Sequence, residues 1–307
     1  MRSLNNLTQS RWGQRLRRST LLAFFICMLS VGFSGVWWQV SNQPAIALAQ
    51  GDAITDPTSL LRYALPFENP TVRKFQEDIE GLSRYLRSKR WSPVKANLKN
   101  ANLQITVKRD KMLATVPEEL QPEASLLIED MAADVEEMRE FAKTKDRANI
   151  WLKRREVLNH LTELEEMMVT EFPFEVPAEY ANLPQLKGRA TILMETNKGD
   201  LTVVLDGYSA PVNAGNFLDL VQRGFYDGLN MFITEEFAVQ SGDPPGPDDG
   251  FIDPGTDEYR SIPLEVLIRG DEEPIYGEIL EDLGIYLPDL VLPFNSYGAI
   301  ALARPDL

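Results

Sequence analysis

Residues 190–243 read ATILMETNKGDLTVVLDGYSAPVNAGNFLDLVQRGFYDGLNMFITEEFAVQSGD. Two runs of β-forming residues, 190–195 and 200–205, flank Thr196-Asn197-Lys198-Gly199, where glycine permits the positive φ of a hairpin turn. From 210 to 221 the apolar residues instead recur at helical spacing. A glycine-bounded turn follows at 224–228, and 229–240 is a broken apolar run. The stretch therefore predicts two strands, a helix, a turn and a strand, in that order.

Three motifs within this stretch are similar to those of one known family. They are Ala210-Pro211-Val212-Asn213-Ala214-Gly215-Asn216-Phe217, Gly224-Phe225-Tyr226-Asp227-Gly228 and Val239-Gln240-Ser241-Gly242-Asp243. In type and order they resemble the cyclophilin family of peptidyl-prolyl cis-trans isomerases. The resemblance implies a closed antiparallel β-barrel with two capping helices over 189–307. An unrelated β-rich domain with similar turns is the alternative.

The family's catalytic residues are not intact in this sequence. An X-Pro bond isomerises over a barrier of about 18–20 kcal/mol, and cyclophilins are understood to lower it with an arginine that donates to the prolyl nitrogen. Alignment of the family pattern on 230–243 puts Met231 at the histidine position and Phe232 at the arginine position. Because phenylalanine donates no hydrogen bond, we expect a loss on the order of a hundred- to a thousandfold in rate. The resemblance thus implies weak or no isomerase activity, and leaves open whether the chain is an enzyme.

The same resemblance supplies peptide-binding candidates. We expect binding of proline-containing peptide segments or unfolded protein, with no cofactor and no metal. For Phe237 a place in the barrel core is the alternative, and for Gln240 a satisfied polar position at a strand end. The candidate positions are Phe237, Ala238, Gln240, Ala303 and Arg304.

The last ten residues, 298–307, resemble a family strand and then stop. The pocket wall and closing strands that the family places after this strand have no counterpart. We therefore expect a truncated product or fragment whose barrel is incomplete at the C-terminus, with unpaired strand edges that favour aggregation. A naturally short variant with a reshaped fold is the alternative.

An acidic, proline-rich loop begins at 244, and short strands are expected around 261–268. Aspartate clusters can bind calcium, but these lack the spacing of an EF-hand loop, so we interpret them as a solvated acidic surface. A lone histidine, His160, favours no histidine-based site. The clustered aspartates are Asp248, Asp249, Asp253 and Asp257.

The first 49 residues are typical of an export signal. Five arginines precede an apolar segment at 21–38, and these 49 residues contain no acidic residue. Ala47-Leu48-Ala49 then offers a cleavage site. Without cleavage the apolar segment is nearly long enough to serve as a membrane anchor. Cleavage removes Cys27, the only cysteine, so the mature protein forms no internal disulfide. We predict an exported protein of the thylakoid lumen or the periplasm.

Charge is distributed unevenly along the remaining chain. From 188 onward six basic residues face twenty-two acidic ones, whereas 50–187 carries twenty basic and twenty-four acidic residues. The C-terminal half should therefore repel nucleic acid and anionic lipid. We expect no nucleic-acid partner, and membrane contact only through an uncleaved signal segment.

Residues 50–171 have a helical pattern. Amphipathic helices are predicted at 71–88, from Ser92 as N-cap to about 112, from about 122 to 142 and from Asp146 to about 168, and four such helices imply a bundle. We interpret the leucine and methionine stripe as bundle core, with a partner-binding seam as the alternative. The proline-rich segment 172–188 is predicted to be a stiff linker.

This α+β organisation, a signal segment, a four-helix bundle, a linker and a cyclophilin-like domain without the arginine, resembles the multidomain thylakoid-lumen cyclophilins of plants and cyanobacteria. The resemblance implies that the helical part is similar to a small extrinsic subunit of photosystem II, and that the protein assists assembly and repair of that complex. Two hypotheses follow. One is a folding or assembly factor, or chaperone, with little isomerase activity; the other is an active exported isomerase acting on X-Pro bonds of folding proteins.

Overall fold

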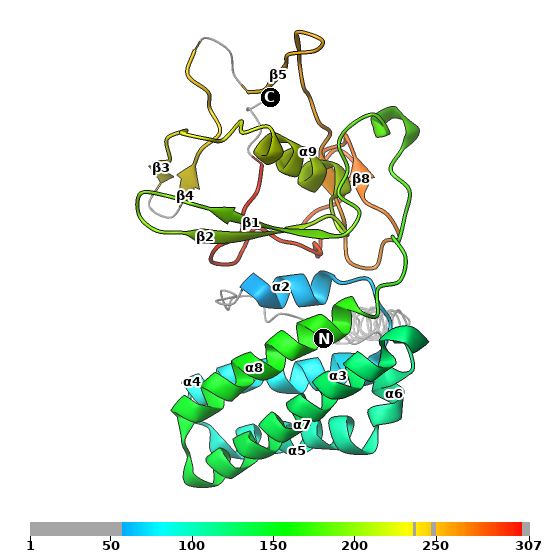
Figure 1. Ribbon diagram of the computed structural model, residues 1–307, viewed down its shortest axis with the longest axis vertical. Helices are drawn as coiled ribbons and strands as arrows, with labels where there is room; N and C mark the ends of the chain where they lie inside the picture. Colours follow the sequence, from blue (N-terminus) through cyan, green and yellow to red (C-terminus); the bar gives the residue numbers. More distant parts are fainter. Residues whose placement is uncertain (1–56, 236–237, 247–249, 303–307) are drawn as a thin grey trace, which may run out of the picture. The chain divides into compact units, whose positions relative to one another are not determined.

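The computed structural model describes residues 57–235, 238–246 and 250–302 (Figure 1). Residues 1–49, predicted to be an export signal, and residues 303–307 lie outside these ranges, so the predictions made for them stay predictions. The helices before the linker are α2 (Pro57–Ala64), α3 (Pro70–Glu80), α4 (Leu82–Arg87), α5 (Trp91–Val107), α6 (Arg109–Leu113), the 3-10 helix η1 (Glu118–Leu120), α7 (Gln121–Thr144) and α8 (Arg147–Glu166).

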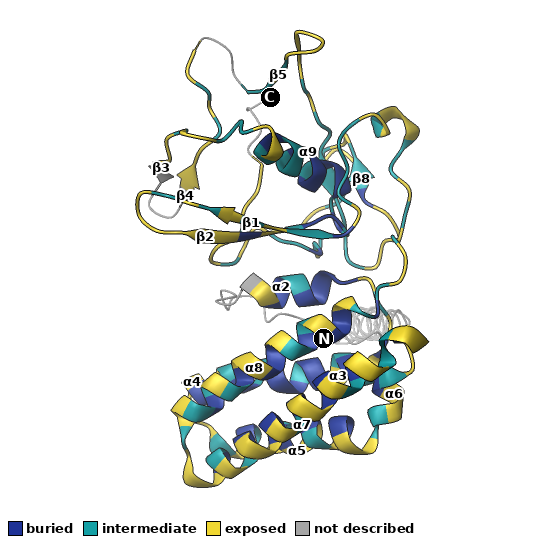
Figure 2. Cartoon of the chain, viewed as in Figure 1, coloured by how far each residue is buried: buried dark blue, intermediate teal, exposed yellow. Residues whose placement is uncertain are grey.

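The helices from α3 to α8 share one apolar core. Helix α7 packs along α8 and α5, and α3 packs against α5 and α8. The side chains at the predicted apolar positions are buried, and Figure 2 shows them along the inner faces of these helices. The leucine and methionine stripe is therefore core, as interpreted from its spacing. The largest of its fully buried side chains include Phe75, Ile79, Leu98, Ile105, Met131, Met138 and Ile150.

The described part of the helical region contains seven α-helices where four were predicted, because two of the predicted helices are broken and one further helix was not predicted. The helix predicted at 71–88 divides into α3 and α4 at Gly81, where a side-chain Cβ would lie 2.9 Å from Asn97 Nδ2 of α5. The helix predicted from Ser92 divides at Lys108, whose φ of −108° and ψ of 22° leave the helical region. Helix α2 precedes both and was not predicted.

Some of the residues at the helix N-termini cap the helix through side-chain hydrogen bonds, and others do not. Asn69 accepts hydrogen bonds from the backbone N–H groups of Thr71 and Val72, and Pro70 is the first residue of α3. Asp146 caps α8 through Asn149 N, as predicted. The Ser92 cap is wrong: α5 begins at Trp91, so Pro93 lies within the first turn, where no intrahelical N–H is needed.

The C-terminal half of the predicted linker packs against the domain that follows it. Leu186 N donates to Pro211 O at 2.9 Å, and Gly207 N donates to Gly188 O at 2.8 Å. A Cβ on Gly215 would lie 2.5 Å from Gln185 Cα, so only glycine fits there. This part of the segment is therefore fixed in place and does not act as a free spacer.

The domain after the linker contains antiparallel hairpins and one α-helix. Four separate two-stranded sheets are present, and the strands of the described residues do not close into a barrel. The first sheet pairs Ile192 with Val203, and α9 lies against its second strand. The elements are β1 (Arg189–Met194), β2 (Leu201–Asp206), α9 (Pro211–Gln222), β3 (Phe232–Glu235), β4 (Ala238–Gln240), β5 (Ile252–Asp253), β6 (Glu258–Tyr259), β7 (Glu265–Val266) and β8 (Ile275–Tyr276), with a further 3-10 helix, η2 (Ala178–Tyr180), in the linker.

None of the helices in the described part of the chain is both long and apolar enough to span a membrane.

Candidate functional site

The β3–β4 hairpin brings two of the predicted site residues together. Phe232 of β3 is the direct cross-strand partner of Gln240 of β4. Directly opposed residues of an antiparallel pair project from the same face, so the two side chains lie next to each other. Phe232 is 44 % exposed, which leaves its ring accessible from solvent. The position that the family resemblance assigns to the catalytic arginine therefore adjoins the position that it assigns to the substrate-binding glutamine.

The remaining predicted residues are less completely placed. Met231 immediately precedes β3 and is 45 % exposed. The backbone of Ala238 begins β4 and pairs with Glu235 across a register shift after Ile233. Phe237, Ala303 and Arg304 lie outside the described residues, so their proposed roles in peptide binding stay predictions.

The turn after α9 supports this hairpin. Ser241 Oγ donates to Asn230 O at 3.1 Å, which ties the two ends of the hairpin together. Gly242 has a φ of 113°, and a Cβ added to it would lie 3.6 Å from the Tyr226 ring. That ring packs against Phe217 of α9 with centroids 4.9 Å apart, and burial raises the pKa of Tyr226 to about 12. Tyr226 is therefore a neutral packing residue at physiological pH.

Helix α9 is anchored at its start by a distant carboxylate. Glu265 of β7 accepts hydrogen bonds from Val212 N at 3.1 Å and from Asn213 N at 2.8 Å. It also accepts one from Asn213 Nδ2 at 2.9 Å. The carboxylate satisfies backbone donors that a helix leaves unpaired at its N-terminus, and its charge complements the helix dipole.

The acidic loop uses its carboxylates structurally. Asp253 accepts a hydrogen bond from Gly255 N at 2.9 Å and pairs with Arg260 at 3.3 Å. Arg260 also pairs with Asp219 of α9 at 2.6 Å. Burial raises the pKa of Asp219, but the guanidinium groups of Arg260 and Arg223 outweigh it and lower that pKa. Within the described ranges no group of three or more potential ligands is arranged to hold a metal ion.

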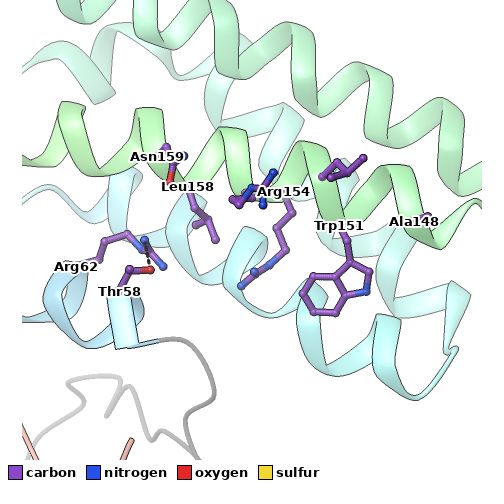
Figure 3. A pocket seen from close by; sticks show the side chains of 9 residues that line it. Thr58, Arg62, Ala148, Trp151, Arg154, Leu158 and Asn159 are labelled. Carbon is purple, nitrogen blue, oxygen red and sulfur yellow. Dashed lines mark hydrogen bonds between the residues drawn. The ribbon is translucent and has the colours of Figure 1, made fainter. Parts of the chain in front are cut away.

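A groove of about 650 Å³ is formed by residues of α2 and α8, and it was not predicted from the sequence (Figure 3). Its walls combine apolar and basic side chains, and Trp151 packs beside the Arg154 guanidinium at 5.5 Å. One signal was present in the sequence: Arg154 lies on the apolar stripe of α8, where a charged residue is unusual. The residues lining the groove are Thr58, Arg62, Ala148, Trp151, Leu152, Arg154, Arg155, Leu158 and Asn159.

Comparison with known proteins assigns both halves of the chain. Residues 56–169 match the model described as peptidyl-prolyl cis-trans isomerase CYP38-like, PsbQ-like domain, and residues 191–306 match the cyclophilin-type peptidyl-prolyl cis-trans isomerase model. A Synechocystis protein named as a thylakoid lumen peptidyl-prolyl cis-trans isomerase is 55 % identical over 291 residues, which are 94 % of this chain and 77 % of that protein. The chain belongs to the multidomain lumenal cyclophilins.

Two plant relatives agree with this assignment. Chloroplastic CYP38 of Arabidopsis thaliana is 39 % identical over 270 residues, and chloroplastic CYP37 of the same plant is 30 % identical over 269 residues. These matches cover 84 % and 80 % of this cyclophilin, but 62 % and 55 % of the respective plant proteins. The chain thus spans less than two thirds of either plant relative.

Proposed function

We propose that this cyclophilin is a folding or assembly factor of the thylakoid lumen that binds proline-containing segments and isomerises them weakly or not at all. The observation that carries the proposal is Phe232, an exposed apolar side chain at the arginine position, in register with Gln240. A ring at this place contributes apolar contact to a peptide but no hydrogen bond to a prolyl nitrogen as it pyramidalises. Binding is thereby separated from catalysis.

The test measures binding and isomerisation on the same peptide. A proline-containing peptide is titrated with the protein and its fluorescence anisotropy recorded, and its cis–trans exchange rate is followed by NMR magnetisation transfer. We expect saturable binding with little acceleration of exchange. Gln240→Ala should weaken binding several-fold, whereas Val239→Ala, on the opposite face of the same strand, should leave it unchanged. Rapid exchange catalysed by the unmodified protein would contradict the proposal.

An active isomerase is the second candidate function. It is supported by the names of the relatives, which describe peptidyl-prolyl cis-trans isomerases. On this alternative the four hairpins are parts of the family's antiparallel barrel, and another donor replaces the arginine. The exchange measurement separates the two candidates, because only this one predicts acceleration by the unmodified protein.

We further propose that the lumenal client is photosystem II. Support comes from the PsbQ-like match of residues 56–169 and from the lumenal and chloroplastic names of the relatives. In this proposal α3–α8 form a bundle comparable to a four-helix extrinsic subunit. Tagged protein incubated with solubilised Synechocystis thylakoid membranes should co-purify with photosystem II subunits, and a tagged protein of similar net charge should not. Equal recovery with both baits would reject the photosystem II client.

A further inference from the structure

Glu165 is a buried acid that the proposed function does not use. It lies in the last turn of α8 with 0 % of its surface exposed, and neither carboxyl oxygen has a hydrogen-bond partner among the described residues. Arg73 of α3 is its nearest cation, with Nη1 3.9 Å from Oε1. That distance is too long for a hydrogen bond. A charged carboxylate in this position is therefore poorly compensated.

Helix α2 is joined to α3 by polar contacts near this carboxyl group, and it also buries the apolar side chains of Leu60, Tyr63 and Ala64. Arg73 Nη1 donates to Arg62 O at 2.9 Å, and Arg73 Nη2 donates to Leu65 O at 2.7 Å. The Arg62 side chain pairs with Glu80 of α3 at 2.6 Å. No described residue of α2 belongs to the apolar core of the helical region. The helix is thus attached by the same arginines that surround Glu165.

The guanidinium of Arg73 directs its hydrogen bonds to other acceptors and not to the Glu165 carboxylate. Besides its two backbone acceptors, Arg73 donates to Gln76 Oε1 at 2.9 Å. The Glu80 carboxylate pairs with both Arg62 and Arg154, and the distance from Arg154 Nη2 to Glu80 Oε2 is 2.8 Å. The groups that interact electrostatically with Glu165 are Arg62 and Tyr63 of α2, Arg73 and Glu80 of α3, and Arg189 of β1. Further charged groups act on these in turn: Glu77 on Tyr63, Arg269 on Arg73, Arg154 on Glu80, and Glu166 and Asp206 on Arg189.

Burial dominates the balance of these charges. It raises the pKa of Glu165 from 4.5 to about 8, although Arg73, Arg62 and Arg189 act in the opposite direction. Burial also raises the pKa of Tyr63, and the Glu80 and Glu165 carboxylates add to that effect. When α2 is detached, water reaches Glu165 and its pKa returns towards the ordinary value. The attached state therefore binds a proton that the detached state releases.

We propose that α2 is a proton-controlled strap, which lies over Glu165 while the carboxyl group is neutral and detaches when it becomes charged. Because the pKa is higher in the attached state, attachment is strongest below about pH 4.5 and weakens as the pH rises to about 8. Above that value both states are ionised and no further change follows.

Detachment reaches beyond the helical region. Arg189 of β1 donates from Nη2 to Leu61 O of α2, and Arg269 Nη1 donates to Tyr63 O at 3.5 Å. Both bonds need α2 in its attached position. The strap thus couples the charge of one buried carboxyl group to contacts made by the domain that carries the candidate peptide site.

Native-state thiol labelling tests the proposal in the full chain. With Cys27 replaced by serine, Ser59→Cys places a single buried thiol on α2, and Ala101→Cys places one in the core of α5. Labelling rates are divided by those of the urea-denatured protein at each pH to give opening constants. We expect the opening constant at position 59 to rise about tenfold per pH unit between about pH 5 and 7, and to level off near pH 8. The constant at position 101 should stay unchanged.

Two α8 variants assign the effect to Glu165. Glu165→Gln keeps the shape but cannot ionise, and should leave the opening constant at position 59 independent of pH. Glu163→Gln, which alters an exposed acid two residues earlier, should retain the full dependence. A flat profile at position 59 in the otherwise unmodified chain would overturn the proposal, whatever the stability of Glu165→Gln. So would parallel changes at 59 and 101, which indicate global unfolding, or an unaltered profile in Glu165→Gln.

Discussion

Asn69 joins the start of α3 to the segment that follows α5. Its side-chain oxygen caps α3, and Nδ2 donates to Lys111 O at 2.9 Å, to Met112 O at 3.1 Å and to Thr115 Oγ1 at 3.0 Å. Since Asn69 is 3 % exposed, water cannot replace these partners. One amide group thus satisfies backbone atoms at two helix ends.

Asn69→Ala should lower the free energy of unfolding of the helical region by about 2–4 kcal/mol, from the lost cap and from unpaired buried carbonyls. With Trp12, Trp37 and Trp38 replaced by phenylalanine, the remaining tryptophans, Trp91 and Trp151, lie in this region and report its urea unfolding. Lys99→Ala, at an exposed position of α5, should change the free energy by less than about 0.5 kcal/mol. Equal midpoints for the two variants would contradict the role of Asn69.

In the domain after the linker, a single side chain, Glu265, caps the start of α9. Glu265→Ala removes three hydrogen bonds at the start of α9, each to a charged acceptor, and should destabilise that turn by about 2–3 kcal/mol. Hydrogen exchange at Val212 and Asn213 should accelerate, while exchange at the C-terminal end of α9 changes less. Glu258→Ala, at an exposed position of β6, is the matched control. Unchanged protection at Asn213 would show that the cap does not stabilise the helix.

At the scale of elements, the packing of the linker on α9 depends on Gly215. Alanine is usually favoured over glycine within a helix by about 0.5–1 kcal/mol. Here an added Cβ would lie 2.5 Å from both Pro184 O and Gln185 Cα, so the linker backbone must move. We predict that Gly215→Ala destabilises the domain by about 1–3 kcal/mol, against the helix preference.

Hydrogen exchange at Leu186 and Gly207 measures this effect, because Leu186 N donates to Pro211 O and Gly207 N donates to Gly188 O of the linker. Exchange there should accelerate in Gly215→Ala and stay unchanged in Gln222→Ala, which alters an exposed residue at the end of the same helix. A more stable Gly215→Ala variant would mean that the linker does not need this close approach.

Some elements were predictable because their signals are local. The first two strands and α9 were predicted to within about one residue, since the hairpin turn and the change of period define them. The break at Gly81 was not, because the apolar spacing continues across it and only the approach of Asn97 reveals it. Helix α2 was missed because, at eight residues, it is too short for a clear helical period. Its start does carry a signal, Pro57 after Asp56.

At the scale of the whole molecule, the sequence identified the family, but the two sites differ in how far the sequence could predict them. Phe232 and Gln240 lie in one motif, so a gapless alignment named both as candidates; their cross-strand pairing is known only from the structure. The environment of Glu165 depends on α2, α3 and α8 converging from distant parts of the chain, and no local pattern encodes that. The one available clue was a charged residue on an apolar stripe.

The most direct test of the central claim, that binding persists where the catalytic donor is absent, is the cis–trans exchange rate of a bound peptide with Phe232→Arg. We predict a gain on the order of a hundredfold, because the guanidinium would lie beside Gln240, and no gain for Val239→Arg on the opposite face. Fast exchange before the substitution, or an equal effect of both arginines, would contradict the account.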